Sequence, residues 1–140
     1  MAKHMSVLII EDEVTTRNIL RARLEKRDGY RVYMAEDGET GLKLAAAKKP
    51  HIILLDWIMP GIDGVETLKH LKSNKNTKDI PVYMLTGKSL MEDVEAAFEE
   101  GAKGYFSKPI YPGDLSAKVR KALIDARSAR LVKKKSRWAA

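Results

Sequence analysis

Residues 51–60, HIILLDWIMP, constrain the fold of this chain more than any other stretch. The four consecutive large apolar residues 52–55 are too few for an isolated helix and are typical of a strand buried on both faces of a parallel sheet. Asp56 closes this run. Ligands of open α/β sheets bind beyond the carboxyl ends of the strands, so we expect Asp56 to carry the chemistry of the protein.

Composition narrows the class of protein. A chain of 140 residues with 44% hydrophobic content is long enough for one domain with a real core. It has no cysteine, which excludes disulfides, a thiol nucleophile and a thiolate metal site. No apolar run approaches the length of a membrane span and no signal peptide is recognisable, so we expect a cytoplasmic protein. Residues 1–5, MAKHM, resemble an expression remnant, and we expect Met5 to be the natural start.

Short apolar segments alternate with segments of helical periodicity along the whole chain. Further strands are predicted at residues 6–10, 30–35, 81–85 and 104–107. Helices are predicted at residues 14–27, 39–49, 65–72 and 90–100, and from Pro112 onward. Five strands that alternate with five helices predict an α/β fold whose parallel sheet is covered on both sides, with right-handed crossovers.

Polar residues capable of chemistry follow four of the predicted strands. These residues are Glu11 and Asp12 after the first strand, Asp56 after the third, Thr86 after the fourth and Lys108 after the fifth. The carboxyl ends of parallel strands share one edge of the sheet, so these side chains should meet. Carboxylates without histidine or cysteine suit Mg²⁺, and a lysine and a hydroxyl beside them leave a place for a phosphoryl group. A carboxylate can act as the nucleophile that forms an aspartyl-phosphate.

These residues resemble a known family. The pair Glu11-Asp12, the ILLD that ends at Asp56, the loop MPGIDG, the LTG around Thr86 and the Lys108-Pro109 step are similar to the receiver domain of two-component response regulators. The resemblance covers residues 6–126 and fills all five motif positions in order. It implies a flavodoxin-like, doubly wound (βα)5 fold with strand order 2-1-3-4-5.

The resemblance also implies a role for each site residue. Asp56 would accept a phosphoryl group from a histidine kinase or phosphotransfer protein. Asp12, Asp56 and the backbone carbonyl of Ile58 would bind Mg²⁺, and Glu11 would act largely through water. We further hypothesise that the bulky Ile58 side chain shields the acyl phosphate from water, and we expect Trp57 to be an exposed loop residue near the metal.

Three more residues would complete the switch. Lys108 would pair with the phosphoryl group, aimed by a cis bond into Pro109. Thr86 would turn toward the phosphate, and Tyr105 would exchange between exposed and buried rotamers as the readout. Such a protein is a bacterial phosphoacceptor switch, and its only reactions are Mg²⁺-dependent self-phosphorylation and self-dephosphorylation.

The implied partners are a histidine kinase or phosphotransfer protein and a downstream protein that binds the last two helices and the fifth strand. The protein would be a monomer or a phosphorylation-dependent dimer. An alternative is the receiver half of a DNA-binding transcriptional regulator whose output domain is absent from this chain. A phosphatase of the haloacid-dehalogenase type is disfavoured, because it needs a second aspartate where Ile58 stands.

Two other sequence features have simple interpretations. The TGKS of residues 86–89 lacks the earlier glycine of a nucleotide-binding P-loop, because Val82 stands there. Residues 118–140 hold nine basic residues and one acidic residue, which accounts for the net charge of +7. We expect residues 127–140 to continue the last helix for one or two turns and to be a solvated extension or a linker. Contact with nucleic acid would be possible only through this tail.

Overall fold

The computed structural model describes residues 5–59, 61–87 and 91–139, with the side chains of 91–93, 133 and 136–139 left aside. Its centre is a five-stranded sheet in which every neighbouring pair of strands is parallel. The strands are β1 (Ser6–Ile10), β2 (Arg31–Ala35), β3 (Ile52–Asp56), β4 (Val82–Thr86) and β5 (Gly104–Ser107), in the order β2-β1-β3-β4-β5. The predicted fold class and strand order are confirmed.

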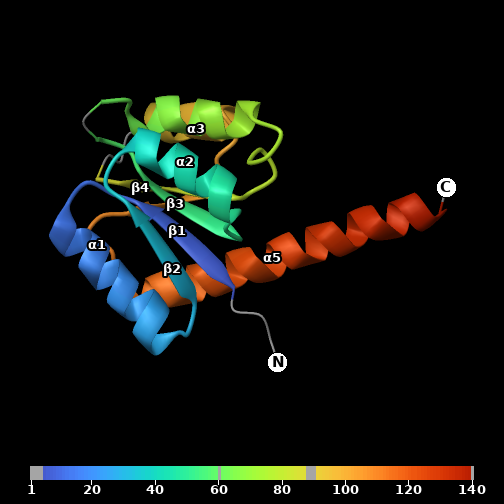
Figure 1. Ribbon diagram of the computed structural model, residues 1–140, viewed down its shortest axis with the longest axis horizontal. Coiled ribbons are helices and arrows are strands. Elements are labelled where there is room, and N and C mark those ends of the chain that lie inside the picture. Colours follow the sequence, from blue (N-terminus) through green and yellow to red (C-terminus); the bar gives the residue numbers. More distant parts are fainter. Residues whose placement is uncertain (1–4, 60, 88–90, 140) are drawn as a thin grey trace.

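Helices cover both faces of this sheet. They are α1 (Val14–Arg21), α2 (Gly38–Lys48), α3 (Gly64–Ser73), α4 (Met91–Glu99) and α5 (Pro112–Ala139). Figure 1 shows α1 and α5 on one side of the sheet and α2 and α3 on the other. No helix in the described part of the chain combines the length and the apolar character that a membrane span needs.

The alternation of side chains along each strand separates two hydrophobic cores. Ile53 and Leu55 of β3 point into the core under α2 and α3, whereas Ile52 and Leu54 point into the core under α1 and α5. All four are fully buried, as expected for a central strand of a parallel sheet. β2 lies at the edge of the sheet and is half-exposed along most of its length, as its sequence predicts.

The predicted helix at residues 14–27 is continuous but changes its geometry. After α1 the chain forms a π-helix, η1 (Ala22–Arg27), which ends where the amide of Asp28 donates to the carbonyl of Arg23 at 3.0 Å. Side chains tie this wide turn to α5. Arg23 Nε donates to Ser116 Oγ at 2.7 Å, and Ser116 Oγ donates to Asp28 Oδ2 at 2.6 Å.

The last helix is much longer than the one or two extra turns that we expected. It runs for 28 residues to Ala139, about 42 Å at 1.5 Å per residue, and its final part extends away from the domain (Figure 1). The sequence after Gly113 contains no proline or glycine and is rich in Ala, Leu, Arg and Lys. These residues have high helix propensity, so nothing in the sequence stops the helix where its contact with the domain ends.

Candidate functional site

Three carboxylates meet at the carboxyl edge of the sheet. Glu11 and Asp12 follow β1, and Asp56 is the last residue of β3, which pairs with β1. One oxygen from each lies within 4.8 Å of the others. Glu11 is fully buried and Asp56 is 4% exposed, whereas Asp12 lies at the surface. The predicted acidic cluster is therefore present, with one side open to solvent.

The amine of Lys108 lies between two of these carboxylates. Lys108 Nζ is 2.7 Å from Glu11 Oε1 and 3.1 Å from Asp56 Oδ1. The backbone places it there, because the Lys108 amide donates to the Thr86 carbonyl at 2.8 Å, and the Lys108-Pro109 peptide bond is cis, as predicted. Residues nearly a hundred positions apart in the sequence are thus in direct contact.

Burial and charge shift the protonation of this cluster. Burial first, and then the neighbouring Asp56 carboxylate, raise the pKa of Glu11 to about 7, although Lys108 acts in the opposite direction. Burial lowers the pKa of Lys108, but the hydrogen bonds and charges of Glu11 and Asp56 outweigh it and leave that pKa raised. The site thus holds more negative charge than one ammonium neutralises, which is the property that a hard divalent cation needs.

Arg17 holds the loop that carries the first two acids, a role that we did not predict. Its Nη1 donates to the backbone carbonyls of Glu11 and Asp12, both at 2.9 Å. A single guanidinium nitrogen therefore fixes the turn between β1 and α1 on which two carboxylates depend. The available sequence signal was an arginine one turn into a helix that directly follows acidic residues.

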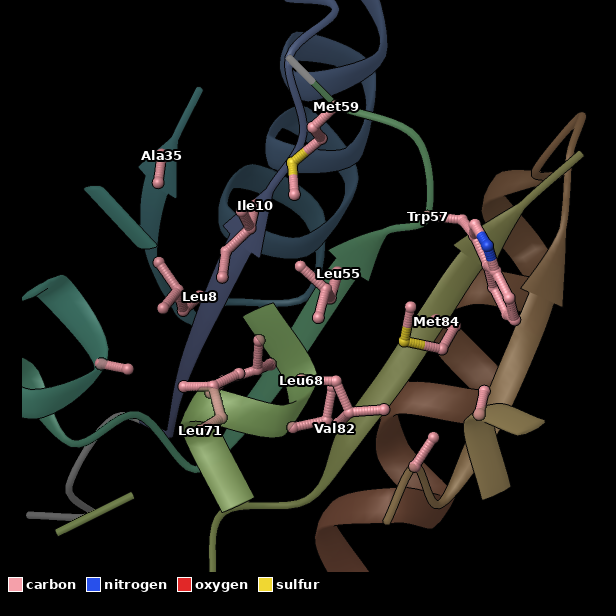
Figure 2. Packing of buried hydrophobic residues seen from close by; sticks show 14 residues of the cluster. Leu8, Ile10, Ala35, Leu55, Trp57, Met59, Leu68, Leu71, Val82 and Met84 are labelled. Atoms are coloured by element: carbon pink, nitrogen blue, oxygen red, sulfur yellow. The ribbon is translucent and has the colours of Figure 1, made fainter. Parts of the chain in front are cut away.

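The loop after β3 differs from our expectation at Trp57. We expected an exposed residue, but Trp57 is only 8% exposed and belongs to the core cluster that also contains Leu55 and Met84 (Figure 2). The reason is the two-residue period of the strand, which continues past Asp56 and keeps Trp57 on the same face as Leu55. Ile58 has the opposite orientation and is 64% exposed. Its proposed shielding role stays a prediction.

Gly64 allows this loop to fold back onto the site. Its amide donates to the Trp57 carbonyl at 2.9 Å, and Asp63 caps the following helix by accepting from the Glu66 amide at 2.9 Å. A Cβ on Gly64 would collide with the backbone oxygen of Asp56 and would lie 2.8 Å from Trp57 Cα. The close packing of this backbone requires a glycine at this position.

The two predicted switch residues lie on neighbouring strands. Thr86 ends β4 and is 1% exposed, and Tyr105 in β5 is 41% exposed. β4 and β5 are paired, with Met84 opposite Tyr105 and Thr86 opposite Ser107. Tyr105 is exposed in this structure, and its exchange with a buried rotamer stays a prediction.

The remaining sequence features lie away from this cluster. His51 contacts Ser6, whose amide donates to His51 Nδ1 at 3.0 Å, and the exposed His70 lies 3.5 Å from Glu66. Neither histidine belongs to the acidic cluster. Pro60 of the MPGIDG loop, residues 88 and 89 of TGKS and the predicted helix start at residue 90 lie outside the described residues.

Residues 7–120 match the response regulator receiver domain family. The chain belongs to this family. Phosphate regulon transcriptional regulatory protein PhoB of Escherichia coli K12 is 38% identical over 114 residues, which are 81% of this chain and 49% of PhoB. KDP operon transcriptional regulatory protein KdpE of the same strain is 42% identical over 118 residues, 84% of this chain and 51% of KdpE. This receiver domain thus spans about half the length of the curated relatives it matches.

Solved structures of similar proteins have the same fold. The chemotaxis protein CheY4 of Vibrio cholerae superposes with a TM-score of 0.82 at 28% identity, covering 86% of this chain and 99% of CheY4. The receiver domain of the sensor histidine kinase PA1611 from Pseudomonas aeruginosa has a TM-score of 0.79 at 25% identity, covering 86% and 98%. That structure has a magnesium ion coordinated in its active-site cleft. Receiver domains of two-component response regulators are phosphoacceptor switches.

Proposed function

We propose that this receiver domain takes a phosphoryl group onto Asp56 from a histidine kinase or phosphotransfer protein, in the presence of Mg²⁺. The observation that carries the proposal is the contact of Lys108 Nζ with both Glu11 and Asp56, beside a third carboxylate within 4.8 Å. An amine and three acids in one cluster, of which Asp12 is exposed to solvent, can bind a phosphoryl group and the cation that accompanies it.

Asp56, Lys108 and Thr86 would each have a different role in this transfer. One carboxylate oxygen of Asp56 would form the new bond to phosphorus as the bond from phosphorus to the donor breaks, and the donor group leaves with that electron pair. Lys108 would move its contact from the Asp56 carboxylate to a phosphoryl oxygen. The hydroxyl of Thr86, at the end of the adjacent strand, would donate to another. The same residues would serve when water later removes the phosphoryl group.

The donor set fits magnesium. Asp12, Asp56 and the backbone carbonyl of Ile58 would hold the ion, with Glu11 acting largely through water, and all of these ligands are oxygens. Glu11 is buried with a raised pKa, which indicates a site that gains from added positive charge. When bound, the cation would neutralise charge on the transferring phosphoryl oxygens.

Phosphorylation would be read out on the neighbouring surface. It replaces one carboxylate charge with a group of roughly −1.5 to −2 and three acceptor oxygens. Thr86 would move toward this group, and Tyr105 would turn inward into the space that it leaves. Tyr105, Phe98 and Tyr111 line an open groove between β5, α4 and α5. A downstream partner would bind in this groove, where it would detect the rotation of Tyr105.

Acetyl phosphate tests the chemistry directly. With Mg²⁺ present we expect intact-mass spectrometry to show one added phosphoryl group, and peptide mapping to place it on Asp56. Asp56→Asn, which keeps the shape of the side chain, should lose this product entirely, because an amide oxygen is a far poorer nucleophile than a carboxylate. Incorporation that persists in Asp56→Asn would contradict the proposal, and beryllofluoride binding to the parent alone provides a second readout.

A second experiment concerns Glu11 and uses pH. The pKa of Glu11 is about 7 in the folded protein against 4.5 for the free side chain, so without metal the folded state binds more protons than the unfolded state between these values. The melting temperature of the metal-free protein should therefore fall as pH rises from 4.5 to 7. Mg²⁺ should raise the melting temperature more at pH 8 than at pH 6, because it binds the ionised cluster.

Glu11→Gln provides the control for this pH dependence. The variant keeps the size of the side chain but removes its titration, so its metal-free melting temperature should vary less over the same pH range. Differential scanning fluorimetry gives the melting temperatures of the parent and of Glu11→Gln, each with and without Mg²⁺, across this pH range. Identical pH profiles for the parent and Glu11→Gln would show that the titration of Glu11 is not the source of the effect.

The relatives favour one alternative output. PhoB and KdpE are transcriptional regulatory proteins, and the segment that matches this chain is about half of each. This chain would then be the receiver half of such a regulator, whose output domain is absent from this chain. The length of the complete gene separates this alternative from a stand-alone switch that binds a protein partner.

A further inference from the structure

The face of α5 that packs on the sheet changes from apolar to basic residues near Ala126. Within the domain this face is apolar, with Val119 and Leu123 buried and Ala126 half-buried. One helical turn after Ala126 the same row of the helix reaches Arg130, and one turn later Lys134. Both are exposed. The row that faces the sheet therefore continues beyond the domain as a row of positive charges.

The rest of the extension adds charge of the same sign. Residues 127–137 contain six basic residues, and no acidic residue follows Asp125. This stretch is about 15 Å long as a helix. Such a density of one charge along a helix whose Arg127, Arg130 and Lys134 are exposed is the electrostatic signature of an anionic partner.

The basic row also adjoins the edge of the sheet where the strands begin. His51 lies just before β3, and its burial lowers its pKa. The positive charge of the nearby Arg130 lowers that pKa further. The chain that leads to His51 carries the exposed Lys48 and Lys49, and the exposed Arg31 begins β2. Figure 1 shows α5 leaving the domain on this side of the sheet. Helix and edge thus form one basic corner.

The apolar residues of the extension do not form a surface for a membrane. Leu131 and Val132 are exposed, at 51% and 63%, but Lys135 follows them by four and three residues and therefore lies between them on the helix surface. A helix that lies in a bilayer surface needs an uninterrupted apolar face. This helix does not have one.

A second copy of the chain is also a poor partner for this helix. Pairing through Ile124 and Leu131 would bring Arg127 and Lys134 of one copy against the same residues of the other. Like charges at such a seam repel, and no acidic residue of the extension compensates them.

We propose that the extension of α5 binds the phosphate backbone of duplex nucleic acid through Arg127, Arg130 and Lys134. An α-helix with its side chains is about 10–12 Å wide, which the major groove of B-DNA, about 12 Å wide, accommodates. The contacts are to phosphates, so binding is independent of sequence and weakens steeply with salt.

Fluorescence anisotropy of a labelled DNA duplex of mixed sequence, measured with the full 140-residue chain at several NaCl concentrations, tests this proposal. Arg130→Ala/Lys134→Ala should weaken binding at low salt by roughly tenfold or more and should lower the salt slope by about 2, since each neutralised phosphate contributes about 0.9. Both positions are exposed and lie far from Asp56 in the fold, so phosphorylation by acetyl phosphate should be unchanged and shows that the variant is folded.

Lys43→Ala/Lys69→Ala is the matched control, because it removes the same charge from exposed positions on α2 and α3. Affinity in this variant should stay close to that of the parent. An equal loss in both variants would overturn the proposal, since net charge alone would then explain binding. Binding of phosphatidylserine vesicles or polyglutamate as tightly as the duplex, with the same loss in Arg130→Ala/Lys134→Ala, would also overturn it.

Discussion

Lys108→Met should slow the transfer of a phosphoryl group from acetyl phosphate to Asp56 by about a hundredfold or more, the typical effect of removing one preorganised hydrogen-bond donor from a transition-state site. The variant loses the ammonium that lies 2.7 Å from Glu11 and 3.1 Å from Asp56. It should still fold at neutral pH, because Glu11 already has a pKa of about 7 and can take up a proton when its counter-charge is removed.

Lys103→Met is the control for this experiment. Lys103 is exposed just before β5, so the same substitution there removes a surface charge without touching the acidic cluster. Intact-mass time courses on parent, variant and control give the rates. A Lys108→Met protein that is phosphorylated as fast as Lys103→Met would show that the amine has no part in the transfer.

Gly64→Ala should have the largest effect on stability. The added methyl group would overlap the backbone oxygen of Asp56 and approach two backbone atoms of Trp57 to 2.8 and 2.9 Å. Backbone cannot rotate away as a side chain can, so the loop must move. Overpacking typically costs about 1–3 kcal/mol, and we expect the upper part of that range or more. Phosphorylation should fall as well, because the displaced backbone carries Asp56.

Gly113→Ala makes the same chemical change where it has room. Gly113 is in the first turn of α5, and a Cβ built on it would have no described atom within 4 Å beyond its chain neighbours and the backbone of its own helix. This variant should melt at or slightly above the parent temperature, because alanine has the higher helix propensity. Urea denaturation of the three proteins compares them. Equal midpoints for Gly64→Ala and Gly113→Ala would mean that the loop absorbs the methyl group without strain.

The fold and the acidic cluster could be predicted because both depend on simple patterns. A fully buried parallel strand needs an uninterrupted apolar run, and each run stops at the edge where ligands bind. Ile52 to Asp56 shows both properties in five residues. The order of the strands could not be derived from these patterns and came from the family resemblance.

The predictions that were wrong or missing have equally specific causes. Trp57 was expected to be exposed because a turn-rich loop follows Asp56, yet the strand's alternation continues one residue further and buries it. The length of α5 was underestimated because we expected the helix to end soon after its packing face does, whereas helix propensity alone carries it to Ala139. Arg17 and Gly64 were missed because their roles depend on backbone atoms, which a sequence does not place.

Because α5 is one continuous helix, it can act as a lever arm. Its first residue, Pro112, is four positions after Lys108, and its last turn is about 42 Å away. A tilt of about 10° at the domain end would displace the far tip by about 7 Å for a rod of that length. A change at the carboxyl edge of the sheet that reorients the first turn would therefore be amplified at the opposite end of the molecule.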